Sequence, residues 1–138
     1  MQKTYTIKEL IPQREPMLMV DNLDHCEGPI AQSHLEIKAD NIFVDNGEFR
    51  ESGIMEHIAQ TAAAQAGYNE LIAGNPVVLG FIGSIDKMKI TRLPKVGETL
   101  HTTIEIGTQI DTITMVHANT TTDNGEVAEC SMKIFLKK

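Results

Sequence analysis

The alternation of apolar and polar residues along the chain predicts a protein built mainly from β-strands. In several segments apolar side chains occupy every second position, which is the period of a strand with one buried face. Further segments are strand-like, among them a run rich in β-branched residues. The predicted strands are residues 17–24, 30–38, 77–82, 85–91, 100–106, 112–121 and 128–136. Gly28-Pro29 and Asp123-Asn124-Gly125 mark turns between consecutive strands.

One long helix is predicted for residues 52–73. The segment is rich in alanine, which favours a helix, and Ser52 is a candidate N-cap. The sequence Gly74-Asn75-Pro76 is expected to end the helix. A small apolar face would allow this helix to lie very close to a sheet, and its members are Met55, Ala59, Ala62 and Ala66.

The order of these elements indicates an α+β fold. Residues 5–10 are predicted to form a short helix, and the polar residues 40–50 are predicted to form a loop. One long helix followed by an antiparallel meander is an α+β architecture. No repeat or linker divides the chain, so one domain covering residues 1–138 is expected. A sheet curled around one helix leaves strand edges that need cover, so we expect a homodimer or a larger homo-oligomer.

Charge and composition narrow the classes of partner. The net charge of −7 argues against nucleic acid, because phosphate binding needs clustered lysine and arginine. An acidic carrier protein stays compatible with a local basic patch formed by Lys87, Lys89, Arg92 and Lys95. No signal peptide and no membrane span are expected. The two cysteines have no metal-binding spacing, so we expect reduced thiols and a cytoplasmic location.

Three segments of the chain resemble the 3-hydroxyacyl-acyl-carrier-protein dehydratases, a family with the hotdog fold. IPQREPMLMVD at residues 11–21 resembles their N-terminal Leu-Pro-His-Arg-x-Pro segment, and MEHIAQTAA at 55–63 resembles the start of their central helix. GFIGSIDKMKITRLPKVGETL at 80–100 resembles their third and fourth strands. The shorter SGIMEHIAQTAAAQAG at 52–67 is also similar to small dehydratase-like proteins of aryl-polyene and flexirubin-type pathways. The resemblance implies one long central helix wrapped by a curled antiparallel sheet.

The resemblance also implies a substrate and an oligomeric site. It implies a 3-hydroxyacyl thioester carried by acyl carrier protein on a phosphopantetheine arm, entering a tunnel at a subunit interface. In this family a histidine from a loop before the helix acts with an acid from the helix of the other subunit. Glu56 falls on the position of that acid, and Gln60 falls on the family's glutamine.

The chemistry of dehydration agrees with a carboxyl group at position 56. A base must remove the proton beside the thioester carbonyl, and an acid must protonate the leaving hydroxyl. Glu56 lies in the first turn of the predicted helix, and Gln60 lies one turn later on the same face, where it could orient the carboxylate or a water. The alternatives are a solvated glutamate at a helix start and a buried glutamine bonded to a strand backbone.

The histidine loop of the family is altered in this chain. The family's Gly-His-Phe-Pro corresponds to Gly47-Glu48-Phe49-Arg50, and a second family histidine corresponds to Gln13. Glu48 could replace the histidine as a base, giving a site with two carboxylates, or it could be an exposed loop residue. His57 is a further candidate for catalysis, although it could equally face the core or the solvent.

Four residues are candidates for substrate binding. Gly53 precedes Glu56, and free N–H groups at the helix N-terminus could bind the thioester oxygen. Gly83 could let an acyl-pantetheine chain approach the backbone, with Phe81 and Ile82 lining the tunnel, or it could mark a bulge within the sheet. No metal motif and no dinucleotide-binding loop is present, so no cofactor is expected.

Three functions remain open from the sequence. The first is a dehydratase-like protein that acts on 3-hydroxyacyl thioesters carried by acyl carrier protein, in fatty-acid or polyene-type synthesis. The second is a non-catalytic hotdog subunit that partners a catalytic dehydratase, which the missing histidine favours. The third is an acyl thioesterase that uses the helix carboxylate to activate water.

Overall fold

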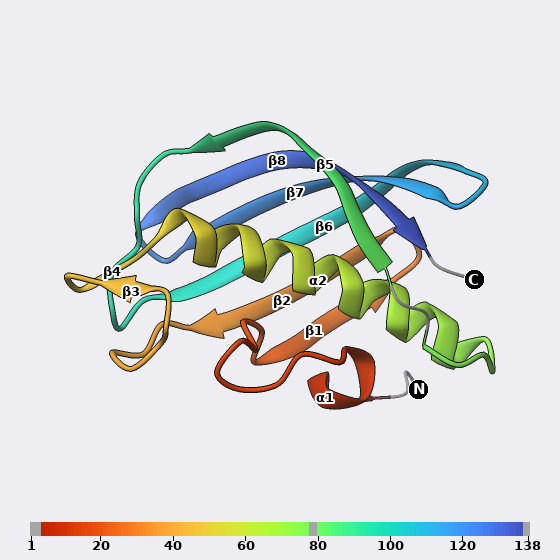
Figure 1. The fold of residues 1–138 in the computed structure, drawn as a ribbon, viewed down its shortest axis with the longest axis horizontal. Coiled ribbons are helices and arrows are strands. Elements are labelled where there is room, and N and C mark those ends of the chain that lie inside the picture. The colour runs from red at the N-terminus through yellow and green to blue at the C-terminus, as the bar shows by residue number, and fades with distance from the viewer. Residues whose placement is uncertain (1–3, 78–79, 137–138) are drawn as a thin grey trace.

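A curled antiparallel sheet of six strands carries one long helix across its concave face (Figure 1). The computed structural model describes residues 4–77 and 80–136. The order of strands in this sheet is β1-β2-β6-β7-β8-β5. These strands are β1 (Asn22–Glu27), β2 (Ile30–Glu36), β5 (Gly80–Ile90), β6 (Thr99–Ile110), β7 (Ile113–Thr122) and β8 (Gly125–Leu136). The arrangement confirms the predicted α+β class and the expected hotdog fold.

Short elements complete the fold at both ends of the long helix. Helix α1 (Ile7–Leu10) lies where a short helix was predicted, and it packs with the N-terminal segment against α2 (Glu51–Ile72). The predicted loop at residues 40–50 contains a small hairpin of β3 (Val44–Asp45) and β4 (Glu48–Phe49). Its turn is formed by Asn46 at φ 54° and Gly47 at φ 77°, a backbone that suits a two-residue hairpin. The sequence identified this turn but not the strands beside it.

Several predicted strands have different limits in the structure. The first strand begins at Asn22 instead of residue 17, because the backbone of residues 17–19 bonds to helix α2 instead of a neighbouring strand. The two strands predicted on either side of Gly83-Ser84 form one continuous strand, β5, with a shift of register at this point. Residues 78 and 79 of the earlier prediction lie outside the described residues.

Helix α2 begins one residue earlier than predicted and shows a different face to the sheet. Its N-cap is Arg50, which makes no side-chain capping bond, so the prediction of Ser52 as the N-cap was wrong. Met55, Ala59 and Ala66, predicted to face the sheet, are only partly buried. The buried face instead contains large and polar side chains, namely Ile54, His57, Ile58, Gln60, Thr61, Gln65 and Tyr68. In the described parts of the chain no helix is long and apolar enough to cross a membrane.

A buried histidine fixes the first turns of α2 to the sheet. The side chain of His57 has no exposed surface, and its Nδ1 atom lies 2.7 Å from the carbonyl oxygen of Met19. Its Nε2 atom lies 2.8 Å from the Thr102 hydroxyl on β6, which in turn lies 2.6 Å from the Thr120 hydroxyl on β7. Both ring nitrogens therefore have partners, and the helix is tied to two strands and to the N-terminal segment.

Further buried polar groups extend this anchorage along the helix. The Gln60 side chain accepts a hydrogen bond from the Met19 backbone N–H at 2.7 Å and donates one to the Met17 carbonyl at 2.8 Å. The Thr61 hydroxyl lies 2.7 Å from the Ser33 hydroxyl on β2. Each buried bond of this kind contributes about 1 kcal/mol net, but an unpaired group would cost more. The set therefore selects one rotation of α2 on the sheet.

Burial keeps His57 neutral in the folded protein. Removal from water lowers its pKa from 6.5 to about 4, and the hydrogen bond to Met19 opposes this shift only in part. Because the folded-state pKa is depressed, the full stability is present above the unfolded pKa of 6.5. Below that pH the unfolded chain takes up a proton that the folded protein refuses, so stability falls until the pH approaches the folded pKa.

We expect the free energy of unfolding to fall by about 2 kcal/mol between about pH 7.5 and pH 5 through this histidine alone. Urea unfolding followed by circular dichroism at a series of pH values measures it. In His57→Asn the protein should be less stable at neutral pH and its stability should depend less on pH over this interval. The matched change His117→Asn, at an exposed position, should keep the wild-type slope. An equal slope in wild type and His57→Asn would contradict the assignment.

Candidate functional site

Glu56 is the candidate acid/base residue, and it lies on the side of α2 that is not fixed to the sheet. Successive helical residues are turned by about 100°, so Glu56 points away from the neighbouring, fully buried His57. Its side chain is half-buried beside the partly buried Met55 and Ala59. No hydrogen bond or ion pair joins it to any other residue that the structure describes. A carboxyl group of this kind can accept a proton from a ligand or donate one to it.

The other two polar candidates on the helix are occupied by structural bonds. His57 uses both ring nitrogens within the core, and Gln60 uses both ends of its amide on the backbone of Met17 and Met19. Gln60 is therefore a buried amide whose hydrogen bonds are made to backbone groups. These backbone groups belong to the segment before β1, whereas the sequence suggested a strand. Neither side chain bonds to the carboxylate of Glu56.

Glu48 lies on β4, just before the N-terminus of α2. One of its carboxylate oxygens is 3.6 Å from an Arg50 guanidinium nitrogen, and about two fifths of both side chains is exposed, at 38% and 40%. The same guanidinium is 3.3 Å from the carboxylate of Glu51. Glu48 is thus part of a surface ion pair, which agrees with the interpretation of an exposed residue. Because it lies beside the start of α2, its role as a base stays a prediction.

Gly53 is packed tightly instead of lining an open anion site. A Cβ atom at this position would lie 2.6 Å from Phe43 Cβ and 2.6 Å from Phe49 Cζ, so only glycine fits between the two rings and the helix. Its N–H donates to the Arg50 carbonyl at 3.0 Å. The N–H groups at the helix N-terminus without an intrahelical acceptor are those of Glu51 and Ser52.

The predicted tunnel residues lie on β5, at the edge of the sheet. Ile82 is 44% exposed, a large value for an isoleucine. Gly83 is the bulge residue of β5, and a Cβ atom there would lie 1.8 Å from the Phe135 ring on β8. The alternative of a sheet bulge therefore describes Gly83. The side chain of Phe81 lies outside the described residues.

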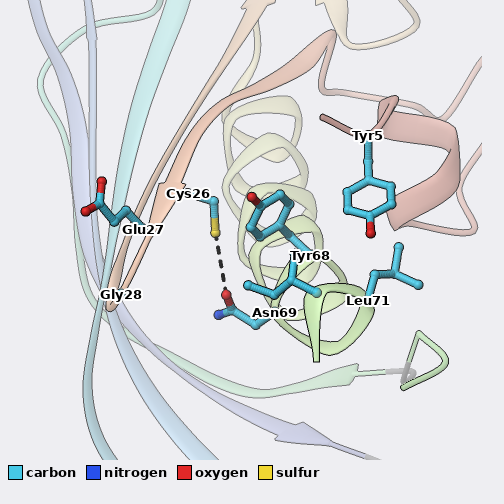
Figure 2. Close-up of a pocket in the computed structure, with 8 residues that line it drawn as sticks. Tyr5, Cys26, Glu27, Gly28, Tyr68, Asn69 and Leu71 are labelled. Carbon is cyan, nitrogen blue, oxygen red and sulfur yellow. Dashed lines mark hydrogen bonds between the residues drawn. The ribbon is translucent and has the colours of Figure 1, made fainter. Parts of the chain in front are cut away.

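The cavities described in the single chain do not include Glu56. A cavity of about 480 Å³ lies at the opposite end of α2, between Tyr5, Tyr68, Leu71 and the β1–β2 turn (Figure 2). There the Cys26 thiol is 3.7 Å from the Asn69 side-chain oxygen, and burial raises its pKa to about 11, so it is no nucleophile at neutral pH. A second cavity of about 230 Å³ lies between the later turns of α2 and strands β6, β7 and β8.

One member of the predicted basic patch is neutralised within the fold. Arg92 donates two hydrogen bonds to the Glu98 carboxylate, at 2.8 and 3.1 Å. These bonds lower the pKa of Glu98 to about 2, and bonds from the Lys95 backbone N–H, Thr122 and Asn124 add to the effect. This cluster ties the β5–β6 connection to the β7–β8 turn, and no local sequence pattern predicted it. The exposed part of the patch is reduced to Lys87, Lys89 and Lys95.

One of these lysines, Lys95, lies near the start of α2. Lys95 forms an isolated backbone bridge with Glu48, and the Phe49 N–H donates to the Pro94 carbonyl at 2.8 Å. Lys87 and Lys89 lie on the second half of β5, where the register shifts again. Among the described residues, no group of three or more histidines, cysteines and carboxylates is arranged to hold a metal ion.

Comparison with known proteins agrees with this fold. Residues 5–138 match the family model of ApeP-like proteins, described as ApeP dehydratase. The 3-hydroxyacyl-acyl-carrier-protein dehydratase FabZ of Bacillus subtilis is 31% identical, over 96% of this chain and 96% of that protein. A chain of the dehydratase heterocomplex ApeI:P from Xenorhabdus doucetiae superposes with a TM-score of 0.90 at 10% identity, covering 99% of this chain and 93% of that one.

A weaker similarity concerns the fold alone. A hypothetical thioesterase from Streptococcus pneumoniae, solved with coenzyme A, superposes with a TM-score of 0.69 at 10% identity over 84% of each chain. The match to the family model covers nearly the whole chain, and the FabZ relative is similar over nearly its full length. This chain therefore belongs to the ApeP-like family of dehydratases, which confirms the predicted relationship to the 3-hydroxyacyl-acyl-carrier-protein dehydratases.

Proposed function

We propose that this protein takes part in the dehydration of 3-hydroxyacyl thioesters carried by acyl carrier protein, with Glu56 as its acid/base residue. The observation that supports this most is the state of Glu56. It is a half-buried carboxylate on the central helix, with no partner among the described residues, while its polar neighbours on the helix are bonded to the core. A structural glutamate would normally be paired or fully solvated.

The reaction needs one proton to leave carbon and one to reach oxygen. The base removes the proton beside the thioester carbonyl, the C–H electrons form the new double bond, and the C–O bond breaks as the hydroxyl is protonated and leaves as water. In the proposed role Glu56 supplies or receives one of these protons. The N–H groups of Glu51 and Ser52 at the helix start are candidates to stabilise the developing enolate oxygen.

The mechanism needs a second acid/base group, and neither His57 nor Glu48 is free to supply it in the single chain. His57 has no free nitrogen for it, and Glu48, which stands where the family has histidine, is held in an ion pair with Arg50. A neighbouring subunit is the natural source of the missing group. We therefore propose that the active site is completed across a subunit interface, by a second copy of this chain or by a different hotdog chain.

Strand β5 is the edge through which such a subunit would join. It is the last strand of the sheet, opposite β1, so one row of its backbone groups has no neighbouring strand in the single chain (Figure 1). Its first half carries the exposed Ile82, whereas Lys87 and Lys89 and a register shift interrupt the second half. Pairing is therefore expected along the first half, close to the helix.

The carrier protein is proposed to approach from the side of the lysines. Lys87, Lys89 and Lys95 are exposed, and Lys95 lies beside the hairpin that leads into α2. The chain as a whole is acidic at −7, so a local cationic surface is needed for an acidic carrier to dock. The arrangement would bring a phosphopantetheine arm to the same end of the helix as Glu56.

A second function is supported by the occupied histidine. With Glu48 in place of the family's histidine and His57 sealed in the core, the chain could contribute the fold and the interface to a complex whose other subunit performs the chemistry. This non-catalytic role would leave Glu56 dispensable. Substitution of Glu56 separates the two proposals.

We expect Glu56→Gln to lower turnover at least about 100-fold, because the amide cannot exchange a proton during elimination. The measurement is hydration and dehydration of a 2-enoyl chain on acyl carrier protein, followed by the enoyl absorbance, with the chain alone and with a co-purified partner subunit. The size and shape of the side chain are kept, so the melting temperature should stay near that of the wild type.

The matched control is Glu70→Gln, a change of the same kind on the same helix, which should leave turnover unchanged. Retained activity in Glu56→Gln would contradict the catalytic proposal and favour the non-catalytic subunit. Release of free thiol from acyl thioesters, with no change in enoyl absorbance, would instead identify a thioesterase.

Assembly through β5 leads to a separate expectation. Ile82→Asp should weaken association, because a charge would be buried at the joined edge, and the shift from oligomer to monomer should be visible by light scattering coupled to size exclusion. The same substitution at Ile110, which is 68% exposed near the tip of the β6–β7 hairpin, should leave the assembly intact. If Ile82→Asp assembles as well as the wild type, with itself or with its partner chain, β5 is not the interface.

A further inference from the structure

Two histidines lie side by side on the convex face of the sheet, away from the proposed active site. His34 of β2 and His101 of β6 are direct partners in the antiparallel register. Their ring centres are 6.3 Å apart and their planes are inclined by 41°. Their neighbours in sequence, Ser33 and Thr102, are fully buried on the inner side. The alternation of the strands therefore directs both imidazoles outward to the same patch of surface.

A third residue orients one of these rings. Asp24 is the extra residue of a bulge in β1, because Leu23 pairs with Ser33 and His25 pairs with Gln32. A bulge changes the direction of a side chain, and both Asp24 carboxylate oxygens lie 2.8 Å from the Nδ1 atom of His34.

That contact decides which nitrogen of the ring is free. A carboxylate can only accept a hydrogen bond, so Nδ1 of His34 carries a proton, and in the neutral ring Nε2 keeps its lone pair. Asp24 is itself held by the Asn22 side chain, which donates to it at 3.1 Å. A carboxylate that orients a histidine in this way is the usual outer support of a metal-bound imidazole.

We propose that His34 and His101 form a binding site for a divalent transition metal ion of the zinc or nickel type, with Asp24 as a positioning residue. Two imidazoles bound to one ion at a tetrahedral angle have ring centres about 5 Å apart, because each metal–nitrogen bond is about 2 Å long. The observed separation is 6.3 Å, so the exposed His101 ring would turn toward His34 by about 1 Å on binding. Imidazole nitrogen suits zinc, copper and nickel, and water completes the coordination in a site with two protein ligands.

The proposed metal site lies directly behind the strand residues that hold the central helix. Ser33 immediately precedes His34 and Thr102 immediately follows His101, and these two hydroxyls hold Thr61 and His57 of α2 on the other side of the sheet. An ion that joins the two histidines would clamp β2 to β6 behind the anchorage of the central helix. Metal binding would therefore stabilise the folded protein by mass action.

The test is titration of the full-length protein with zinc chloride by isothermal calorimetry, repeated with nickel chloride. We expect one ion per chain and at least a tenfold loss of affinity in His34→Asn and in His101→Asn. Asp24→Asn keeps both ligands but no longer fixes the tautomer, so an intermediate loss is expected. Zinc should also raise the melting temperature of the wild type and have little effect on that of either histidine variant.

His117→Asn is the matched control, because His117 is exposed on β7 and pairs across the sheet with Glu105 and Ser131 instead of a second histidine. It should bind zinc as the wild type does. Absence of binding by the wild type would overturn the proposal. Unchanged affinity in either His34→Asn or His101→Asn would overturn it as well, as would an equal loss in His117→Asn, because the ions would then be bound without a defined site.

Discussion

The position of the whole candidate site depends on the bonds that His57 makes inside the core. Its two nitrogens join the central helix to Met19 on one side and to Thr102 on the other, and the Thr102 hydroxyl continues to Thr120. Because a buried imidazole without these partners would be costly, the helix has one rotation that satisfies it. That rotation turns Glu56, the preceding residue, toward the side of the helix that the sheet does not cover. The free carboxylate is thus a consequence of the occupied histidine.

The chain differs from the pattern of its family in the loop before the helix. Where the family has a histidine before the helix, Glu48 is tied to Arg50 at the surface. Among the described residues no second acid/base group is therefore bonded to the carboxylate of Glu56. The free edge of β5 and the lysines beyond it provide surfaces for the two partners that the proposed function needs. These are a neighbouring subunit and a carrier protein.

The sheet separates two kinds of surface chemistry. Its concave side holds the helix through hydroxyl, amide and imidazole groups that are fully bonded. Its convex side exposes the paired imidazoles of His34 and His101, and the Asp24 bulge directs a carboxylate to one of them. In β2 and β6, a residue that contacts the helix is adjacent in sequence to a histidine on the convex face, because successive side chains of a strand point to opposite faces. A change on one face can therefore reach the other through a single strand.

The sequence by itself determined the fold class, the long helix and the strands with clear alternation, and it singled out Glu56 as the candidate acid/base residue. These follow from local periodicity and from similarity to a family, which one chain can show. It did not determine which face of α2 meets the sheet, because an alanine-rich stripe and a stripe with His57, Gln60 and Thr61 are both compatible with a helix. Only the tertiary structure decided between them, since the polar stripe finds its partners on β2, β6 and the N-terminal segment. The small hairpin before α2 and the Arg92–Glu98 cluster likewise depend on contacts between residues distant in sequence, which no local pattern encodes.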